Sequence, residues 1–373
     1  MTLPSCKSID YIPLSRVELH VHLDGSLRHE TIWELAKKKG ITLPGKGTFQ
    51  DLKKALTITE PNGLQHFLNP FTLFIPTIIG DLDSIERVAY EFCEDEARNG
   101  VIYVEARYSP HFLLPSDVPK TYEALCEVIK AVNRGFKRGE NDFKVKARQI
   151  ICALVGANMI RDVIRLCEQF RDEGVVGLDT AAMSTSDLSE YAVPLCKMLI
   201  FVEEVSLGVD EVLVYQEASR LGIHRTVHAG EIGSAEMVKR AVEEYNSERI
   251  GHGYNVLSDP AVYDMCRKKD IHFETCPWSS LLTGAVPLGV NKHPIVRFAE
   301  DNINFSLSSD DPTVTGCFVE GDYRLTASWG LSEAHFVRCN FNAAYSSFLP
   351  SNEKKELIDL LIKTYGVKGF EKM

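Results

Sequence analysis

The chain has 373 residues, of which 45% are hydrophobic and 25% charged, and its formal net charge is −11. This is ordinary globular composition, and an acidic chain without a basic stripe is a poor candidate for nucleic-acid binding. No apolar run reaches the roughly 18 residues of a membrane helix, and residues 1–15 lack the apolar core of a signal peptide. The ten cysteines form no C-x-x-C pair, and several lie in apolar runs, which predicts buried free thiols in a reducing compartment.

Short strand-like runs alternate with longer amphipathic stretches along the chain. The runs are rich in β-branched and aromatic residues and lie between turn residues, which predicts strands. They cover residues 16–22, 101–107, 147–154, 174–179, 224–229, 249–252, 271–275 and 303–309. The intervening stretches repeat apolar residues at three- and four-residue spacing, which predicts helices. The clearest of these cover residues 85–99, 121–138, 158–172 and 234–247.

Eight strands that alternate with helices predict one parallel (β/α)8 barrel, an α/β fold that spans residues 1–373 as a single domain. A doubly wound open sheet is the alternative, but such sheets usually gather ligand groups at one switch point. Here polar clusters follow strands throughout the chain. Residues 27–80 are too long for a simple crossover, and residues 331–366 follow the last strand, so extra helices are expected in both places.

Four apolar residues of the first insertion share one helical stripe. The residues alone leave open whether this stripe packs as core or covers the barrel mouth as a lid, and they favour core. Pro70 lies within the stripe and is expected to kink its helix. The four residues are Leu64, Phe67, Leu68 and Phe71.

His20 and His22 stand at the end of the first predicted strand. They are two residues apart, so both side chains point to the same face, which in a barrel is the lumen. Two imidazoles in a dry lumen are costly unless something uses them. A metal site explains the pair, and structural hydrogen bonds to the backbone are the alternative.

His228 ends another predicted strand, and Glu231 follows it on the next loop. A buried glutamic acid with a raised pKa could act there as a general acid, whereas a solvated loop residue would have no such role. His252 lies between two glycines, which let the backbone approach a ligand closely. A neutral imidazole there could orient or deprotonate a water molecule, or it could be a satisfied core histidine.

Asp310 and Asp311 end the last predicted strand. Adjacent side chains diverge on a strand, so one carboxylate can complete a metal shell while the other meets a ligand, although one of them could instead cap a helix. Three histidines and a carboxylate suit Zn²⁺, and zinc makes a water nucleophilic near neutral pH, which predicts hydrolytic chemistry. Two more polar clusters, Asp179 and residues 275–277 (TCP), also follow strands.

These clusters lie in segments that resemble the adenosine deaminase family, in its cytosolic vertebrate form. The resemblance extends over nearly the whole chain, including the tail. Its segments are residues 19–26 (LHVHLDGS), 226–231 (TVHAGE), 248–253 (ERIGHG), 272–280 (HFETCPWSS), 306–312 (SLSSDDP) and 342–350 (NAAYSSFLP).

The resemblance implies a cytoplasmic enzyme of purine metabolism that hydrolyses adenosine and 2′-deoxyadenosine to inosine and 2′-deoxyinosine, with release of ammonia. It also implies a cell-surface protein partner, and one zinc ion per chain. In this resemblance Glu231 would protonate purine N1, His252 would hold and help deprotonate the attacking water, and Asp311 would meet N7. The zinc ligands would be His20, His22, His228 and Asp310.

The resemblance also assigns the rest of the ligand pocket. Asp24 would accept from the ribose 5′-hydroxyl, and His22 would border the ligand. The four-residue stripe of the first insertion matches the family's hydrophobic lid, which reverses the preference for core. An N6-substituted AMP is a weaker substrate hypothesis, because Asp24 would repel its phosphate.

The sequence departs from the family after the fourth strand. The family has a glycine there whose backbone N–H meets purine N3, and Ala182 takes its place. The Cβ of alanine projects where close approach or a positive φ is needed. Residues 183–215 also look unlike the family. These departures motivate a second hypothesis, in which the chain is a catalytically impaired isoform or paralogue that only binds adenosine.

Overall fold

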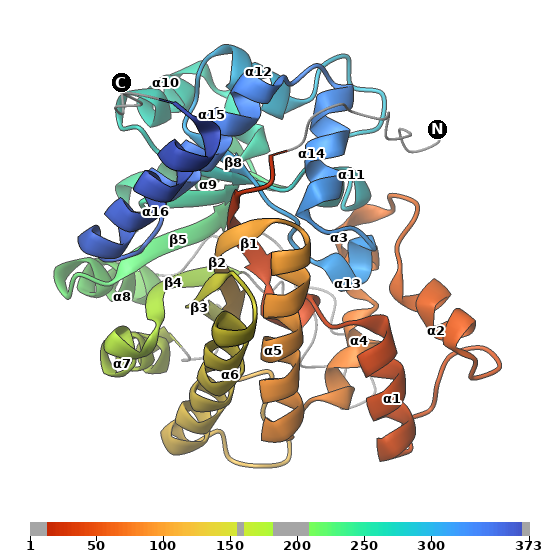
Figure 1. Ribbon diagram of the computed structural model, residues 1–373. Helices are drawn as coiled ribbons and strands as arrows, with labels where there is room; N and C mark the ends of the chain where they lie inside the picture. Colours follow the sequence, from red (N-terminus) through yellow and green to blue (C-terminus); the bar gives the residue numbers. More distant parts are fainter. Residues whose placement is uncertain (1–12, 155–159, 182–208, 368–373) are drawn as a thin grey trace.

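The computed structural model describes residues 13–154, 160–181 and 209–367. At its centre is a sheet of eight parallel strands, in which each strand pairs with the next one along the chain (Figure 1). The strands are β1 (Arg16–His22), β2 (Val101–Tyr108), β3 (Lys146–Leu154), β4 (Val175–Ala181), β5 (His224–Ala229), β6 (Arg249–His252), β7 (His272–Thr275) and β8 (Phe305–Leu307). All eight predicted strands are therefore confirmed.

The sheet closes between its first strand and the segment that follows its last. Val21 and Asp310 form a parallel bridge. The amide of His22 donates to the carbonyl of Asp310 at 2.8 Å, and the amide of Asp310 donates to the carbonyl of His20 at 3.1 Å. The predicted (β/α)8 barrel is confirmed, and these hydrogen bonds lie beside the predicted metal ligands.

Helices surround the barrel and fill the two predicted insertions (Figure 1). Between β1 and β2 lie α1 (His29–Lys39), α2 (Phe49–Leu56), α3 (Gly63–Leu68), α4 (Phe71–Phe74) and α5 (Leu82–Arg98). The later crossovers contain α6 (Tyr122–Asp142), α7 (Ile160–Gln169), α8 (Val209–Arg220), α9 (Ala235–Glu243), α10 (Pro260–Lys268), α11 (Pro277–Leu282) and α12 (Pro294–Glu300). After β8 come α13 (Pro312–Thr315), α14 (Val319–Ser328), α15 (Glu333–Ser346) and α16 (Ser351–Tyr365).

The apolar stripe of the first insertion is divided between two short helices. α3 ends at Leu68 and α4 begins at Phe71, because Pro70 lacks the N–H that a continuous helix needs. Phe67, Leu68 and Phe71 are buried in the main hydrophobic core, and Leu64 is partly buried against it. α3 packs against α11, which directly follows β7 at the barrel mouth. The stripe thus packs as core beside the mouth, and its role as a lid stays a prediction.

The segment after α15 covers the amino end of the barrel. The amide of Phe348 donates to the buried carboxylate of Glu105 on β2 at 2.6 Å. Arg249, the first residue of β6, donates to the carbonyl of Ser346 at 3.1 Å. These contacts leave the opposite, carboxyl end of the strands as the mouth.

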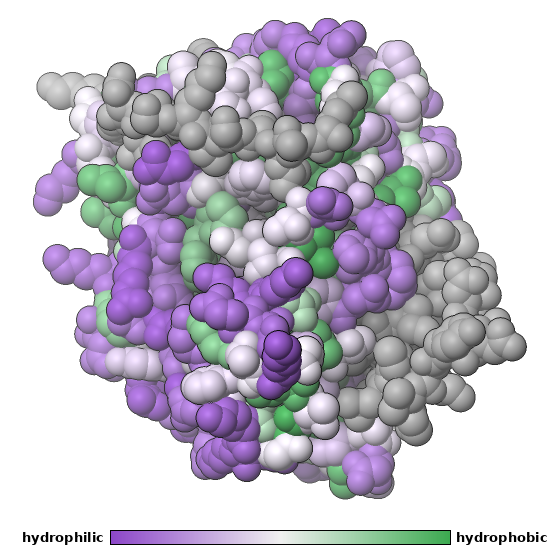
Figure 2. Space-filling model, turned by 90° about the vertical axis from the view of Figure 1, so that its right-hand side faces the viewer, coloured by the Kyte–Doolittle hydropathy of each residue, from purple (hydrophilic) through white to green (hydrophobic). Residues whose placement is uncertain are grey.

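The described part of the surface over α1 and α2 is mostly hydrophilic. Figure 2 shows this face, where apolar side chains form small, separate patches. The large apolar side chains that are most exposed also lie far apart in the sequence, from Leu14 to Leu360. No helix among the described residues is both long and apolar enough to cross a membrane.

Two glycines of α6 let this helix lie against α5. A Cβ on Gly135 would meet the carbonyl oxygen of Glu86 at 2.4 Å and the Cβ of Ala89 at 2.5 Å. A Cβ on Gly139, one turn further on, would meet the Cβ of Cys93 at 2.3 Å. Close packing of α5 and α6, which cover β2 and β3, therefore depends on glycine at both positions.

We expect Gly135→Ala to destabilise the fold. Overpacking costs about 1–3 kcal/mol and outweighs the gain in helix propensity, which is at most about 1 kcal/mol. Thermal unfolding measures the effect, with Lys137→Ala as the control at an exposed position of the same helix. A Gly135→Ala midpoint equal to or above that of the wild type would contradict the close approach.

Candidate active site

His20 and His22 are placed at the carboxyl end of β1, as predicted. His20 is fully buried and His22 is half-buried, and their ring centroids are 5.7 Å apart. Their alternation on the strand turns both rings to the inside of the barrel, because residues two apart share a face. The sequence pattern H-x-H therefore delivers two imidazoles to one point.

Two more histidines reach the same point from β5 and β6. The ring of His20 lies 4.7 Å from that of His228 and 4.6 Å from that of His252, measured between centroids. The rings of His228 and His252 are 5.2 Å apart. The barrel thus gathers four imidazoles that are up to 232 positions apart in the sequence, from three strands.

Asp310 adds a carboxylate to this cluster. Its Oδ1 lies 3.4 Å from Nε2 of His20 and 3.5 Å from Nε2 of His22. The backbone of Asp310 has a φ of 65°, a left-handed conformation that non-glycine residues rarely adopt. This conformation lies three residues after the end of β8 and brings the carboxylate to the histidines.

A metal ion fits the donor atoms at this point. Ligand atoms of His20, His22 and His228 lie within 4.8 Å of one another. Nε2 of His20 is buried and makes no hydrogen bond within the described residues, and Oδ1 of Asp310 lies 3.4 Å from it. A buried polar atom without a partner is costly unless a ligand satisfies it, and imidazole with carboxylate is a donor set that suits Zn²⁺.

Carboxylates hold the other ring nitrogens of two histidines. Nδ1 of His20 lies 2.7 Å from Oε2 of Glu274, and Nδ1 of His228 lies 3.0 Å from Oδ2 of Asp179. Metal-binding histidines commonly use their second nitrogen in this way, which fixes the ring and its tautomer. The sequence placed Asp179 at a strand end but did not indicate that it would contact a histidine, and Glu274 was not among the predicted site residues. One feature could have indicated Glu274, because a charged residue inside the predicted strand 271–275 needs a polar partner.

A second set of potential ligands includes Cys276. Its Sγ lies within 4.8 Å of ligand atoms of His20, His252 and Asp310. Burial raises the pKa of this thiol well above its ordinary value. Three histidines with one carboxylate are a donor set that suits Zn²⁺, so we favour His20, His22 and His228 completed by Asp310.

His252 and Glu231 lie side by side at the mouth. Nε2 of His252 is 3.6 Å from Oε2 of Glu231, and both side chains are buried. Burial, with a smaller contribution from His20, lowers the pKa of His252 well below its ordinary value and keeps the imidazole neutral. Gly251 allows the close packing here, because a Cβ would meet the ring of His20 at 2.8 Å.

Asp310 and Asp311 differ in the direction of their pKa shifts. Burial, and then the charge of Asp310, raise the pKa of Asp311 well above its ordinary value. Burial opposes ionisation of Asp310 as well, but the neighbouring imidazoles hold its pKa well below the ordinary value. These shifts favour an anionic oxygen ligand at Asp310 and a protonated carboxyl group at Asp311.

Asp24 completes the described part of the mouth. Its Oδ1 lies 3.7 Å from Nδ1 of His22, and its Oδ2 accepts from the amide of Ser109 at 3.3 Å. Gly25 brings the chain against Asp311, whose Oδ1 would lie 1.8 Å from an added Cβ. Ala182 falls outside the described residues, as do residues 183–208 of the atypical segment.

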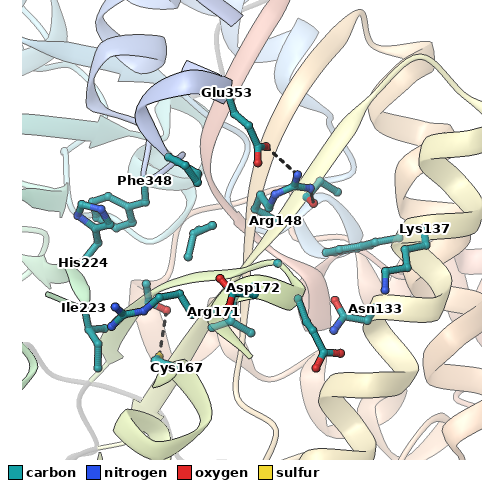
Figure 3. A pocket seen from close by; sticks show the side chains of 18 of the residues that line it. Asn133, Lys137, Arg148, Cys167, Arg171, Asp172, Ile223, His224, Phe348 and Glu353 are labelled. Atoms are coloured by element: carbon teal, nitrogen blue, oxygen red, sulfur yellow. Dashed lines mark hydrogen bonds and ion pairs between the residues drawn. The ribbon is translucent and has the colours of Figure 1, made fainter. Parts of the chain in front are cut away.

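A separate cavity of about 420 Å³ lies at the other end of the barrel, near the amino ends of β3, β4 and β5 (Figure 3). One wall carries the ion pair between Arg148 and Glu353, and another carries the stacked rings of His224 and Phe348. His224 begins β5, whereas His228 lies near the carboxyl end of that strand. The predicted site residues therefore gather away from this cavity.

An eight-stranded parallel barrel with histidines and carboxylates at the carboxyl ends of its strands defines the class of metal-dependent barrel hydrolases. The family model described as adenosine deaminase matches residues 15–364. The chain is 43% identical over 361 residues to adenosine deaminase from Bos taurus, covering 94% of each chain. The chain belongs to the adenosine deaminase family, and its expected assignment as an enzyme of this family is confirmed.

Solved structures show the same fold at lower identity. The N6-mAMP deaminase of arabidopsis superposes with a TM-score of 0.75 at 22% identity, covering 94% of this chain and 98% of that one. A cog1816 amidohydrolase from Burkhoderia ambifaria, described with bound Zn, gives 0.71 at 19% identity, covering 94% and 92%. These likenesses support the barrel fold.

We expect Cys276→Ser to retain metal binding and His228→Ala to lose it. The serine variant preserves the histidine set, whereas the alanine variant removes one ligand from a four-ligand centre. Competition with a chromophoric chelator measures both metal affinities on the purified proteins. Loss of metal from the serine variant alone would instead assign the ion to the set that contains Cys276.

Proposed function

We propose that this chain hydrolyses adenosine and 2′-deoxyadenosine to inosine and 2′-deoxyinosine, with release of ammonia, and that it uses one zinc ion. The observation that carries the proposal is the convergence of three histidines and Asp310 beside Glu231 and Asp311 at the barrel mouth. Membership of the adenosine deaminase family supports the choice of substrate.

The predicted ligands form one coordination shell in this proposal. His20, His22 and His228 would donate through their ring nitrogens, and Asp310 would donate through Oδ1. When bound, the zinc ion would make a water molecule nucleophilic near neutral pH. Glu274 and Asp179 would hold the imidazoles in place from behind.

Glu231 and His252 would move the protons of the reaction. Glu231 would donate a proton to purine N1, which makes C6 more electrophilic. His252 is neutral, so its ring can orient the attacking water and accept a proton from it. Attack at C6 gives a tetrahedral centre that collapses with loss of ammonia. The 3.6 Å separation of the two side chains suits action on adjacent atoms of one ring.

Asp311 and Asp24 would orient the substrate. A hydrogen bond to purine N7 requires a proton on one partner. The pKa of Asp311 is raised, which favours the protonated carboxyl group, and this group would donate to N7. Asp24 would accept from the ribose 5′-hydroxyl, and His22 beside it would border the ligand. A 5′-phosphate would meet the negative charge of Asp24, which disfavours an N6-substituted AMP.

The cytoplasmic setting and the lid are further parts of the proposal. The eight cysteines within the described residues are all free thiols, which agrees with a reducing compartment. The stripe from Leu64 to Phe71 would lie over the bound purine from its place in α3 and α4. A cell-surface protein partner stays a prediction from the family resemblance.

We expect the purified, zinc-loaded chain to convert adenosine to inosine, and chelation to abolish this activity because the centre loses its metal. The fall in ultraviolet absorbance of adenosine measures turnover, and metal analysis of the same sample measures zinc. Inosine formation unaffected by complete zinc removal would reject the zinc-dependent mechanism. Micromolar adenosine binding without turnover in a zinc-loaded sample would favour the impaired isoform that Ala182 motivates.

We expect Glu231→Gln to retain zinc and lower kcat by about 10²–10⁴-fold, because the amide cannot donate the proton that a general acid supplies. Glu236→Gln is the control, since Glu236 is an exposed residue near the start of α9. Steady-state kinetics and zinc content are measured on both variants. A near-normal rate for Glu231→Gln would show that another group protonates the purine.

A further inference from the structure

Arg107 is an arginine buried inside the barrel, and the proposed chemistry leaves it without a role. It lies near the end of β2 and is paired in register with His22 on β1. Its exposed fraction is 0%. A guanidinium is always charged, so burying it has a large desolvation cost unless several acceptors compensate it.

The guanidinium of Arg107 has three acceptors around the barrel. Nη1 donates to Oδ2 of Asp179 on β4 at 2.7 Å. Nη2 donates to Oε2 of Glu274 on β7 at 2.6 Å and to the carbonyl of Leu19 on β1 at 2.7 Å. One side chain therefore joins strands that lie on different sides of the lumen.

The two carboxylate oxygens that Arg107 contacts are the same two that hold the histidines. Oδ2 of Asp179 lies 3.0 Å from Nδ1 of His228, and Oε2 of Glu274 lies 2.7 Å from Nδ1 of His20. The planar guanidinium fork holds both oxygens, and each oxygen lies against Nδ1 of one imidazole. Its third contact, to Leu19, ties the fork to the residue before His20.

We propose that Arg107 is a positioning residue that sets the orientation of two metal ligands, His20 and His228, through Glu274 and Asp179. This inference rests on the metal site of the proposed function. Arg107 would act on the metal centre without contacting metal or substrate. Its loss would remove the donors that Oδ2 of Asp179 and Oε2 of Glu274 share with it, and so would loosen the two imidazoles beside those oxygens.

Arg249 is a second buried arginine of the lumen, but it does not contact the carboxylate oxygens that lie beside the histidines. It donates to Oε1 of Glu274 at 2.7 Å and to Oε2 of Glu105 at 2.6 Å. It thus contacts the oxygen of Glu274 that faces away from His20, and its second carboxylate is Glu105 instead of Asp179. Of the two arginines, Arg107 alone bridges the oxygens that meet the histidines.

The test compares Arg107→Gln with Arg16→Gln. Arg16 is a matched control, because it is 1% exposed and lies on a barrel strand, but it donates to the carbonyl of Asn99 at the amino end of the barrel. Metal affinity is measured by chelator competition, and the cobalt(II)-substituted proteins give visible spectra that report ligand geometry. Thermal unfolding of both variants records the loss of stability that removing any buried arginine causes.

We expect Arg107→Gln to weaken zinc binding by about 10–100-fold, the usual effect of losing an outer partner of metal ligands, and to change the cobalt spectrum. Arg16→Gln should lower the unfolding midpoint and leave metal affinity and spectrum unchanged. Wild-type zinc affinity and spectrum in Arg107→Gln would overturn the positioning role.

If Arg107→Gln does not fold, Arg107→Lys provides a second test, because it keeps the buried positive charge. A single ammonium lacks the fork that joins Asp179 to Glu274, so we expect weaker zinc binding here as well. Unchanged zinc affinity in the lysine variant would overturn the inference. If the wild-type chain bound zinc no more tightly than His228→Ala does, the metal site of the proposed function would itself be wrong, whatever the Arg107 variants showed.

Discussion

Compensation of buried charge inside the barrel is the constraint on which the rest of the site depends. A series of ion pairs runs through the lumen from Glu105 to Arg249, Glu274, Arg107 and Asp179. Signs alternate at every step, so each ion taken out of water has a partner of opposite charge. Removal of either arginine would leave one buried carboxylate, Glu105 or Asp179, without its arginine partner, and an uncompensated buried charge is strongly destabilising.

The same series of charges leads to the mouth, where it ends on imidazoles. Glu274 and Asp179 each use one oxygen for an arginine and a histidine together. The charges that make the lumen polar therefore also orient His20 and His228. In this barrel, the stability of the interior and the geometry of the candidate metal centre depend on the same carboxylate oxygens.

Barrel closure is the second requirement, because the set of candidate ligands is incomplete until the first strand meets the segment after the last one. The hydrogen bonds between β1 and Asp310 bring a carboxylate against two histidines that precede it by nearly the whole chain. The left-handed backbone of Asp310, and that of His252 with a φ of 63°, are strained conformations that the surrounding barrel holds in place. Strain at functional residues of this kind is tolerated when the packing around them is rigid.

The sequence by itself determined the order of the eight strands, the insertion after the first, and most of the predicted site. Alternation on a strand was enough to turn His20 and His22 to one face, and strand ends marked His228, His252 and Asp310. Family motifs added the purine roles that are proposed for Glu231, Asp311 and Asp24. All of these signals are local, because a period, a turn residue or a short motif is visible within a few positions.

Only the tertiary structure decided which side chains contact the same carboxylate oxygen. Glu274 looked like one charged residue in a strand, Arg107 looked like another, and Asp179 looked like a strand end without a partner. Their roles depend on distances across the lumen between β2, β4 and β7, and such distances exist only after the barrel has closed. The burial of the apolar stripe was decided in the same way, since it depends on packing against helices far away in the sequence.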